Sequence, residues 1–242
     1  MDVQPLVPYV AIYALPVLLA ITLHEAAHGY VARHFGDLTA YAQGRISLNP
    51  ARHIDLVGTL AVPLLVLFAS SGKFLFGWAK PVPVNYSALR RPKPHMACVA
   101  AAGPLANLAM ALGWALLLRL AIAWSDRSVA WEELARRHGS DAVVAAVVRH
   151  GAGAAEFLVG VAAAGVTVNL VFMLLNLLPV PPLDGGRIVT SLLPGRAAWQ
   201  FARIEPFGLF IVLALLFTNV LGLVLRPLLA ESEALVRALV LL

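Results

Sequence analysis

Charged residues are scarce in this chain of 242 residues: Asp, Glu, Lys and Arg make up 13% of it, while 60% is hydrophobic. Soluble domains carry about 25% charged residues, so the composition excludes an ordinary soluble protein and indicates a polytopic membrane protein. Basic residues exceed acidic ones, giving a formal net charge of +5. In a membrane protein such an excess is typical of cytoplasmic loops, and we expect no nucleic-acid partner.

Cysteine is almost absent as well. Cys98 is the only one in the sequence, which excludes an intramolecular disulfide and a metal cluster held by several thiolates. A metal site in this chain would therefore use His, Asp or Glu as its ligands. The sequence also lacks a visible internal repeat, a feature that many transporters show.

The residues that carry chemistry follow the first apolar run. Residues 10–23 contain no charge, and His24, Glu25 and His28 come directly after them. Histidines four apart lie on one face of a helix, where a single metal ion can bind both imidazoles. Glu25 lies between them, as a general base does in zinc hydrolases. Each ionisable group at membrane depth costs about 3 kcal/mol, so we favour a metal site over a chance triplet or a buried polar network.

A catalytic zinc site needs a third protein ligand besides two histidines. Four residues are candidates: His53, Asp55, His95 and Asp184. We expect His53 and Asp55 to be solvated loop residues and His95 to mark a helix entrance. Asp184 follows an apolar run and opens a short helix. It is either the N-cap of that helix or a carboxylate ligand, which would complete a set suited to zinc.

Two motifs together resemble the site-2 protease family of intramembrane zinc metalloproteases, peptidase family M50. The first is HEAAH at residues 24–28 and the second is NLLPVPPLDG at residues 176–185. FGWAKPVPVN at 76–85 and GPLAN at 103–107 are similar to a small bacterial branch of the family that lacks PDZ and cystathionine-synthase-type domains. The resemblance covers most of the chain, from about residue 15 to residue 193.

The resemblance implies one Zn²⁺ per chain, with His24, His28 and Asp184 as its ligands and Glu25 as the general base. It also implies a catalytic role for Asn107 at the scissile bond, although an amide in an apolar helix can equally form a helix–helix hydrogen bond. The implied reaction is hydrolysis of peptide bonds within or near transmembrane segments of protein substrates in the lipid bilayer. Such a substrate must unwind locally, and residues 82–85 or 45–49 are either an exposed edge that pairs with it or simply interfacial loops.

The apolar pattern predicts an all-α polytopic membrane protein, with residues 1–242 forming a single metalloprotease domain. A short apolar run broken by Pro63 predicts a re-entrant segment at 56–76, and residues 38–52 suggest a small extended or β element near the membrane surface. We expect a short helix after Asp184, an extramembrane loop at 125–150 and a weakly amphipathic tail at 226–242. Four full crossings are expected, at 9–35, 96–124, 154–178 and 204–225.

A shared metal ion would fix the topology. His28 and Asp184 can bind one ion only if the number of crossings between them is even. The basic residues would then gather on one face, which the positive-inside rule makes cytoplasmic. We therefore expect a multi-pass protein of the cell membrane, specifically a bacterial inner membrane, with its active site nearer the cytoplasmic side.

Two other functions fit a metal site inside a bilayer. A metal transporter, or a membrane metal-binding protein without proteolytic activity, would also place His and Asp there. Glu25 would have no obvious task in transport, and the halves of the chain do not repeat. A third possibility is a catalytically inactive relative that acts as a chaperone. The complete set of candidate ligands and the candidate base argue against it.

Overall fold

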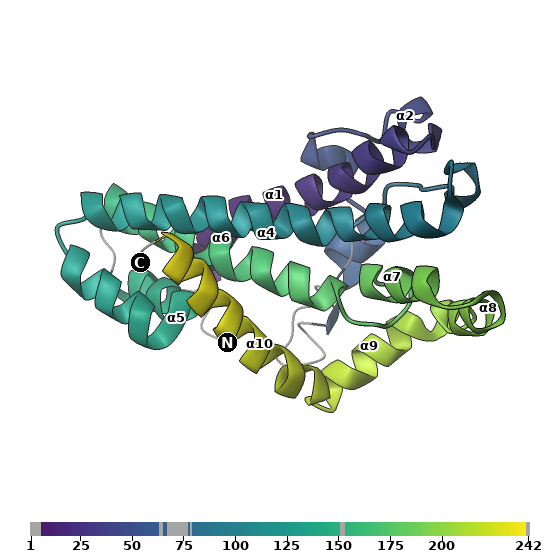
Figure 1. Cartoon of the computed structure of the whole chain (residues 1–242). Coiled ribbons are helices and arrows are strands. Elements are labelled where there is room, and N and C mark those ends of the chain that lie inside the picture. Colours follow the sequence, from purple (N-terminus) through teal and green to yellow (C-terminus); the bar gives the residue numbers. More distant parts are fainter. Residues whose placement is uncertain (1–5, 63–64, 67–76, 78, 151–152, 241–242) are drawn as a thin grey trace.

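Three long helices form the centre of the molecule. The computed structural model describes residues 6–62, 65–66, 77, 79–150 and 153–240. Helices α1 (Leu6–His34), α4 (Pro92–Trp124) and α6 (Ala154–Asn176) pack against one another along most of their lengths (Figure 1). The all-α membrane architecture expected from the sequence is confirmed, and these three helices match the first three expected crossings within a few residues at each end.

Helix α6 is the most buried of the long helices because its middle turns carry small side chains. Residues 159–170 are all buried. A β-carbon added at Gly165 would lie 2.2 Å from Cδ2 of Trp114 on α4. Only a residue without a side chain fits that contact, and small residues of this kind let membrane helices approach closely.

Helix α5 (Ser128–His150) covers one end of the bundle. It is bent at Gly139, which has φ +78°, a conformation that glycine adopts without strain. Trp131, Val143 and Val147 of α5 join the hydrophobic core there, together with Ile12 and Ile122. Its charged residues remain outside, including Glu133, which forms ion pairs with Arg136 and Arg137. Helix α5 occupies most of the expected extramembrane segment.

The C-terminal part differs from the sequence prediction. After α7 (Asp184–Leu192) and α8 (Gly195–Ala202), a 3₁₀ turn η4 (Glu205–Phe207) leads into α9 (Gly208–Phe217). The predicted crossing at 204–225 is therefore wrong in its bounds, because Asn219 has φ +60° and separates α9 from α10 (Val220–Val240). A left-handed Asn is a common way to end a helix.

Within the predicted weakly amphipathic tail at 226–242, residues 226–240 are part of α10, which packs back against α4 and α6. Figure 1 shows α9 and α10 as the two arms of a V that runs from the end with α7 and α8 to the end with α5. One buried carboxylate holds α10 in place. Glu233 accepts hydrogen bonds from Thr167 Oγ1 (2.9 Å) and the Ser140 amide (3.2 Å), and it pairs with Arg237.

The β alternative of the element predicted at 38–52 is not found, since the described residues contain no strand, while residues 45–49 have neither helix nor strand. The segment holds helix α2 (Thr39–Ala42) and a 3₁₀ turn η1 (Pro50–Arg52). Local hydrogen bonds replace the expected strand pairing. Asp37 Oδ1 accepts from the Thr39 amide at the start of α2, and Gly44, with φ +60°, allows the Arg45 amide to reach the Ala40 carbonyl at its end.

The expected re-entrant segment at 56–76 lies largely outside the described residues. Its beginning is described, and there Asp55 caps a π-helical turn, η2 (Leu56–Ala61). The Asp55 carboxylate accepts from the amides of Val57 (3.0 Å) and Gly58 (2.6 Å).

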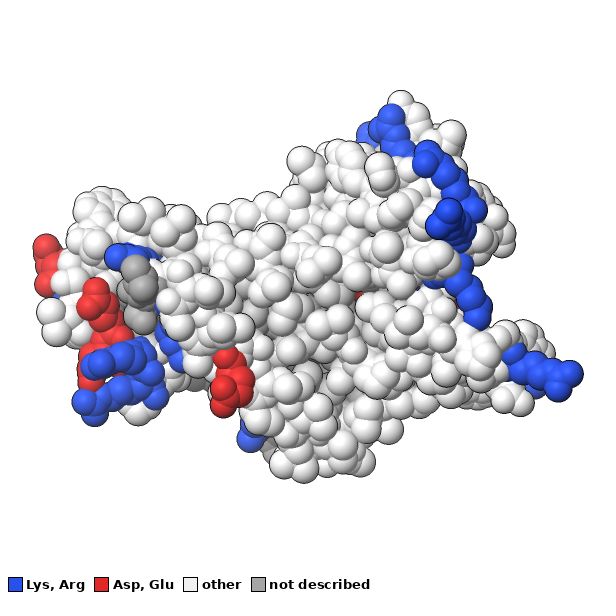
Figure 2. Space-filling model, viewed as in Figure 1, with Lys and Arg blue, Asp and Glu red and all other residues white. Residues whose placement is uncertain are grey.

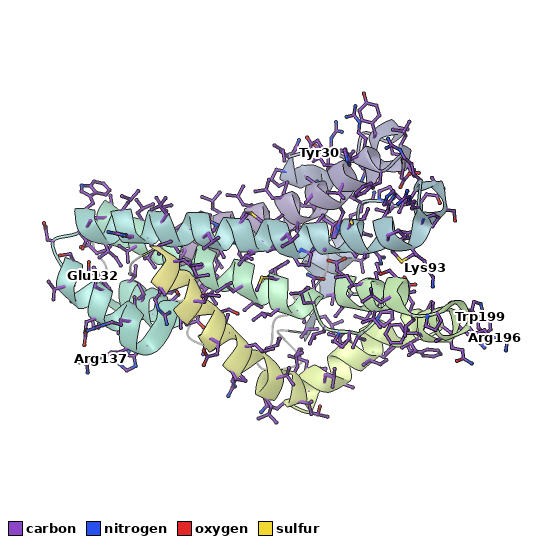
Figure 3. The ribbon with its side chains drawn as sticks, viewed as in Figure 1. Tyr30, Lys93, Glu132, Arg137, Arg196 and Trp199 are labelled. Carbon is purple, nitrogen blue, oxygen red and sulfur yellow. The ribbon has the colours of Figure 1, made fainter. Side chains whose placement is uncertain are left out.

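Four helical stretches in the described part are long and apolar enough to cross a membrane: Val7–His34, Pro92–Trp124, Ala154–Asn176 and Gly195–Phe217. The charges divide between the two ends of this bundle. Figure 2 shows basic residues without acidic neighbours at the end formed by α2, the start of α4 and α8, and acidic and basic residues together around α5 and α10. In Figure 3, Lys93, Arg196 and Trp199 mark the first end, and Glu132 and Arg137 the second. The chain is thus a multi-pass membrane protein with one predominantly basic end.

Candidate metal centre

Three buried side chains from two distant segments converge near the basic end. His24 and His28 lie one turn apart on α1, and Asp184 is the first residue of α7. Asp184 Oδ2 is 3.2 Å from His24 Nε2 and 3.3 Å from His28 Nε2, and the two Nε2 atoms are 3.1 Å apart. The three residues are only 5–7% exposed. They are the one group of three potential metal ligands of this kind among the described residues.

The outer nitrogens of both imidazoles fix the tautomers. His28 Nδ1 lies 2.7 Å from the Val99 carbonyl, which can only accept, so Nδ1 carries the proton and Nε2 carries a lone pair. His24 Nδ1 lies 2.5 Å from Asn107 Oδ1, which gives His24 the same tautomer. Both Nε2 lone pairs and a carboxylate oxygen therefore face one another with no proton between them. Asp184 Oδ2 has no hydrogen-bond donor of its own.

A cation bound between these lone pairs would offset their mutual repulsion, and the spacing of the three atoms fits zinc. Nitrogen and oxygen ligands lie about 2.0–2.2 Å from zinc, so two ligands of a tetrahedral ion stand about 3.3–3.6 Å apart. The observed separations of 3.1–3.3 Å are close to that edge length. Two neutral imidazoles and one carboxylate also form a ligand set that zinc enzymes use, with a fourth position left for water or substrate.

Close backbone contacts position Asp184. It is the first residue of α7, whose N-cap is Leu183, so the N-cap alternative does not describe it. A β-carbon at Gly185 would lie 2.2 Å from the Leu177 carbonyl oxygen, and one at Gly186 would lie 2.4 Å from the backbone nitrogen of Pro181. The two glycines let the first turn of α7 pack directly on the loop that follows α6. This packing sets the distance between α7 and the histidines of α1.

Glu25, between the two histidines, is oriented by a backbone amide. Its Oε2 accepts a hydrogen bond of 2.7 Å from the amide of Val82. We call residues 80–85 the strap; the strap has neither helix nor strand. It is tied down at both ends, because the Lys80 amide donates to the His53 carbonyl (2.9 Å) and the Asn85 amide donates to Asp37 Oδ2 (2.7 Å). The strap thus lies directly beside the candidate metal site.

Comparison with known proteins agrees with this geometry. The family model described as peptidase family M50 matches residues 74–219, which is more than half of the chain. The chain belongs to peptidase family M50. It is 37% identical over 218 residues to "Putative zinc metalloprotease YwhC" of Bacillus subtilis (strain 168), covering 90% of this chain and 83% of that protein.

A second relative of this M50 protein is more distant. "Putative zinc metalloprotease Rip2" of Mycolicibacterium smegmatis is 28% identical over 223 residues, which cover 91% of this chain and 73% of the relative. No solved structure matches the chain. Zinc is the metal of the family, and the protein is accordingly a zinc metalloprotease by family, in agreement with the donor set described above.

The other candidate ligands of this M50 protein have local structural roles. His53 was expected to be solvated but is 2% exposed, and its Nε2 donates to the Ser47 carbonyl at 2.9 Å. Asp55 caps η2. His95 lies in the first turn of α4, as expected, where its ring stacks on Phe35 with centroids 4.0 Å apart. None of the three belongs to the group formed by His24, His28 and Asp184.

Asn107 is next to the metal site, but its contacts differ from those expected of a group that acts on substrate. It is 0% exposed. Its Oδ1 faces His24, and its Nδ2 donates to Asn169 Oδ1 (3.0 Å) and approaches the Ala20 carbonyl (3.4 Å). Both amide hydrogens are therefore directed to protein acceptors. These contacts favour a role in holding His24.

Several groups that shape the site could not be found from residue types alone. The Val99 carbonyl and the Val82 amide belong to the backbone, and valine side chains give no signal for either role. Gly103 in the GPLAN motif is the clearest exception. A β-carbon there would lie 2.5 Å from Nε2 of both His24 and His28, so the glycine keeps the metal-facing side of the imidazoles free.

This contact predicts that Gly103→Ala loses zinc while the protein stays folded. The added methyl group would occupy the space in front of both Nε2 atoms and displace at least one imidazole. We expect zinc content after purification in detergent to fall to a small fraction of one ion per chain, measured by atomic emission.

Gly113→Ala is the matched control, because it lies on the same helix and a β-carbon there meets nothing within 4 Å. The control should retain wild-type zinc. Equal zinc content in the two variants would contradict the close approach of Gly103 to the ligands.

Proposed function

We propose that this M50 protein is an intramembrane zinc metalloendopeptidase of the HExxH type that cleaves peptide bonds within or near transmembrane segments of other membrane proteins. His24, His28 and Asp184 would hold the metal, and Glu25 would act as the general base. The convergence of His24 Nε2, His28 Nε2 and Asp184 Oδ2 within 3.3 Å is the observation that carries the proposal.

The chemistry follows from these donors. When bound, zinc acidifies a coordinated water and polarises the peptide carbonyl. Glu25 would take the proton from the attacking water and deliver it to the leaving amine. One carboxylate oxygen of Glu25 accepts from the Val82 amide, which holds the carboxylate in one orientation and leaves its other oxygen for proton transfer.

The depth of the site supports a substrate inside the bilayer. His24 and His28 lie ten and six residues before the C-terminal end of α1, which places them about 15 and 9 Å below that end. Since the hydrocarbon core is about 30 Å thick, peptide bonds of a membrane-spanning segment would come within reach from one side of the membrane. The three buried ligands also exclude bulk water from the site.

The strap has few free backbone N–H groups with which a substrate strand could pair. Pro81 and Pro83 have no backbone N–H, and the amides of Lys80 and Val82 already donate to His53 and Glu25. Residues 80–83 therefore offer only carbonyl acceptors to an added strand, and those of Lys80 and Pro81 already accept from Arg45 Nη2 (3.0 and 3.3 Å). The Asn85 amide is also engaged, by Asp37. This argues against ordinary two-way β-pairing along the strap, and leaves Val84 and the 45–49 segment as the alternatives for holding an unwound substrate.

The charge distribution favours a metal site nearer the cytoplasm. The end of α1, the start of α4 and helices α7 and α8 lie together at the basic end (Figures 1 and 2). The exposed Trp199 lies at the same end, where its ring contacts Arg203, as is common at a membrane interface. The positive-inside rule would orient this end toward the cytoplasm, in keeping with a cell-membrane location.

The role of Glu25 predicts that Glu25→Gln abolishes peptide cleavage and keeps zinc. The amide is isosteric with the carboxylate but cannot accept the proton, so cleavage of a reconstituted transmembrane peptide should fall at least 10²-fold. The zinc content, measured on the same sample, should remain at the wild-type level because Glu25 is not a ligand. Wild-type cleavage by this variant would falsify the assignment of the base.

The proposed orientation predicts opposite labelling of two single-cysteine variants. With Cys98 replaced by Ser, Ser87→Cys should react with an impermeant maleimide only from the cytoplasmic side, and Val129→Cys on α5 only from the other side. Both positions are exposed in the structure. Labelling of the two positions from the same side would contradict the proposed topology.

A further inference from the structure

A continuous chain of side-chain amides connects three helices to one metal ligand. Asn169 on α6 donates from Nδ2 to the carbonyl of Gly165, at 2.9 Å. Its Oδ1 accepts from Asn107 Nδ2 on α4 at 3.0 Å, and Asn107 Oδ1 in turn lies 2.5 Å from His24 Nδ1 on α1. Both asparagines are 0% exposed, so no water competes for these hydrogen bonds.

Backbone carbonyls fix the direction of every hydrogen bond in this chain. The Gly165 carbonyl can only accept, so the nitrogen of the Asn169 amide must face it and the oxygen must face Asn107. The Asn107 nitrogen then faces both Asn169 Oδ1 and the Ala20 carbonyl, which leaves its oxygen toward His24. His24 must therefore donate from Nδ1, and its Nε2 lone pair is directed toward Asp184 and His28.

We propose that Asn169 is a positioning residue for the metal centre: through Asn107 it holds the His24 imidazole in the tautomer and ring orientation that a zinc ligand requires. The inference rests on the proposed function, in which His24 binds zinc. It gives Asn107 the same positioning role. Asn169 lies one turn beyond Gly165, and it would act on the metal centre without touching the metal or the substrate.

The two histidines are held in different ways. Only His24 needs the hydrogen bonds from Asn169 through Asn107, which we call the relay. His28 donates to a backbone carbonyl, Val99, whose direction helix α4 already fixes. His24 depends on an amide side chain, whose two ends differ only in their hydrogen-bonding character. Without Asn169, only the longer contact to the Ala20 carbonyl (3.4 Å) would oppose a rotation of the Asn107 amide by about 180°, which would present its N–H₂ group to His24 and favour the wrong tautomer. Asn169 prevents this by accepting from the nitrogen.

The expected effect is a loss of zinc affinity. Removing a hydrogen-bond partner of a metal-ligating histidine typically weakens metal binding 10–100-fold. We expect Asn107→Leu to weaken zinc binding by about 10–100-fold and Asn169→Leu by about 10-fold. Leucine has the same number and branching of side-chain heavy atoms as asparagine, although it is larger, and it is well tolerated in an apolar helix, so both variants should insert and fold.

The test is a double-mutant cycle on zinc affinity, measured in detergent by competition with a chromophoric chelator. If Asn169 acts through Asn107, then Asn169→Leu has no further effect in an Asn107→Leu background. Independent, additive losses would instead mean that Asn169 destabilises the bundle generally, and would overturn the relay. Wild-type affinity in the single Asn169→Leu variant would overturn it as well.

Two further variants separate this proposal from the assignment of the site. Thr167→Val, on the same helix, removes a buried hydrogen bond to Glu233 and should leave zinc affinity and the visible spectrum of the Co²⁺-substituted protein unchanged. Asn169→Leu should alter that spectrum. His24→Ala should lower zinc affinity more than any relay variant. Wild-type zinc affinity in His24→Ala would overturn the zinc site itself. If His24→Ala loses zinc affinity while Asn169→Leu keeps the wild-type affinity, only the role of Asn169 is overturned.

Discussion

Three lone pairs that face one another inside an apolar bundle are the constraint on which the structure depends. Two histidine nitrogens and one carboxylate oxygen lie within 3.3 Å of one another, and their protons point elsewhere. In a low-dielectric interior such an arrangement is costly without a positive ion. The bundle must also return the chain to the same end, since α1 supplies two of the candidate ligands and α7 the third. Two intervening long helices, α4 and α6, meet that requirement.

The site is held largely by backbone groups and by residues without side chains. The Val99 carbonyl orients His28, the Val82 amide orients Glu25, and Gly103 leaves room in front of both imidazoles. Gly185 lets α7 approach the end of α6 closely. Such contacts depend on the relative positions of whole helices, so the geometry of the candidate metal site depends on how α1, α4 and α7 pack. His24 is the exception, because a side-chain amide orients it.

The sequence was informative where chemistry depends on local spacing. Histidines at positions 24 and 28 share a helix face whatever surrounds them, and long apolar runs predicted α1, α4 and α6 closely. It was less informative where hydrogen bonds decide between alternatives. The alternating pattern after Leu38 suggested a strand, but Asp37 and Gly44 close a helical turn there. The break at Asn219 depends on one left-handed residue in an apolar run. The contacts of Asn107 depend on which helix lies opposite, which no single segment encodes.

Zinc K-edge X-ray absorption of the purified protein tests the central claim most directly, because it reports the ligands without requiring a substrate. The account predicts two histidine imidazoles, recognised by their multiple-scattering features, and an oxygen shell at about 2.0–2.2 Å, with no sulfur. In His28→Ala recorded with zinc added to saturation, the imidazole contribution should halve. A spectrum with a sulfur shell, or one with two imidazoles that persist in that variant, would contradict the metal centre described for His24, His28 and Asp184.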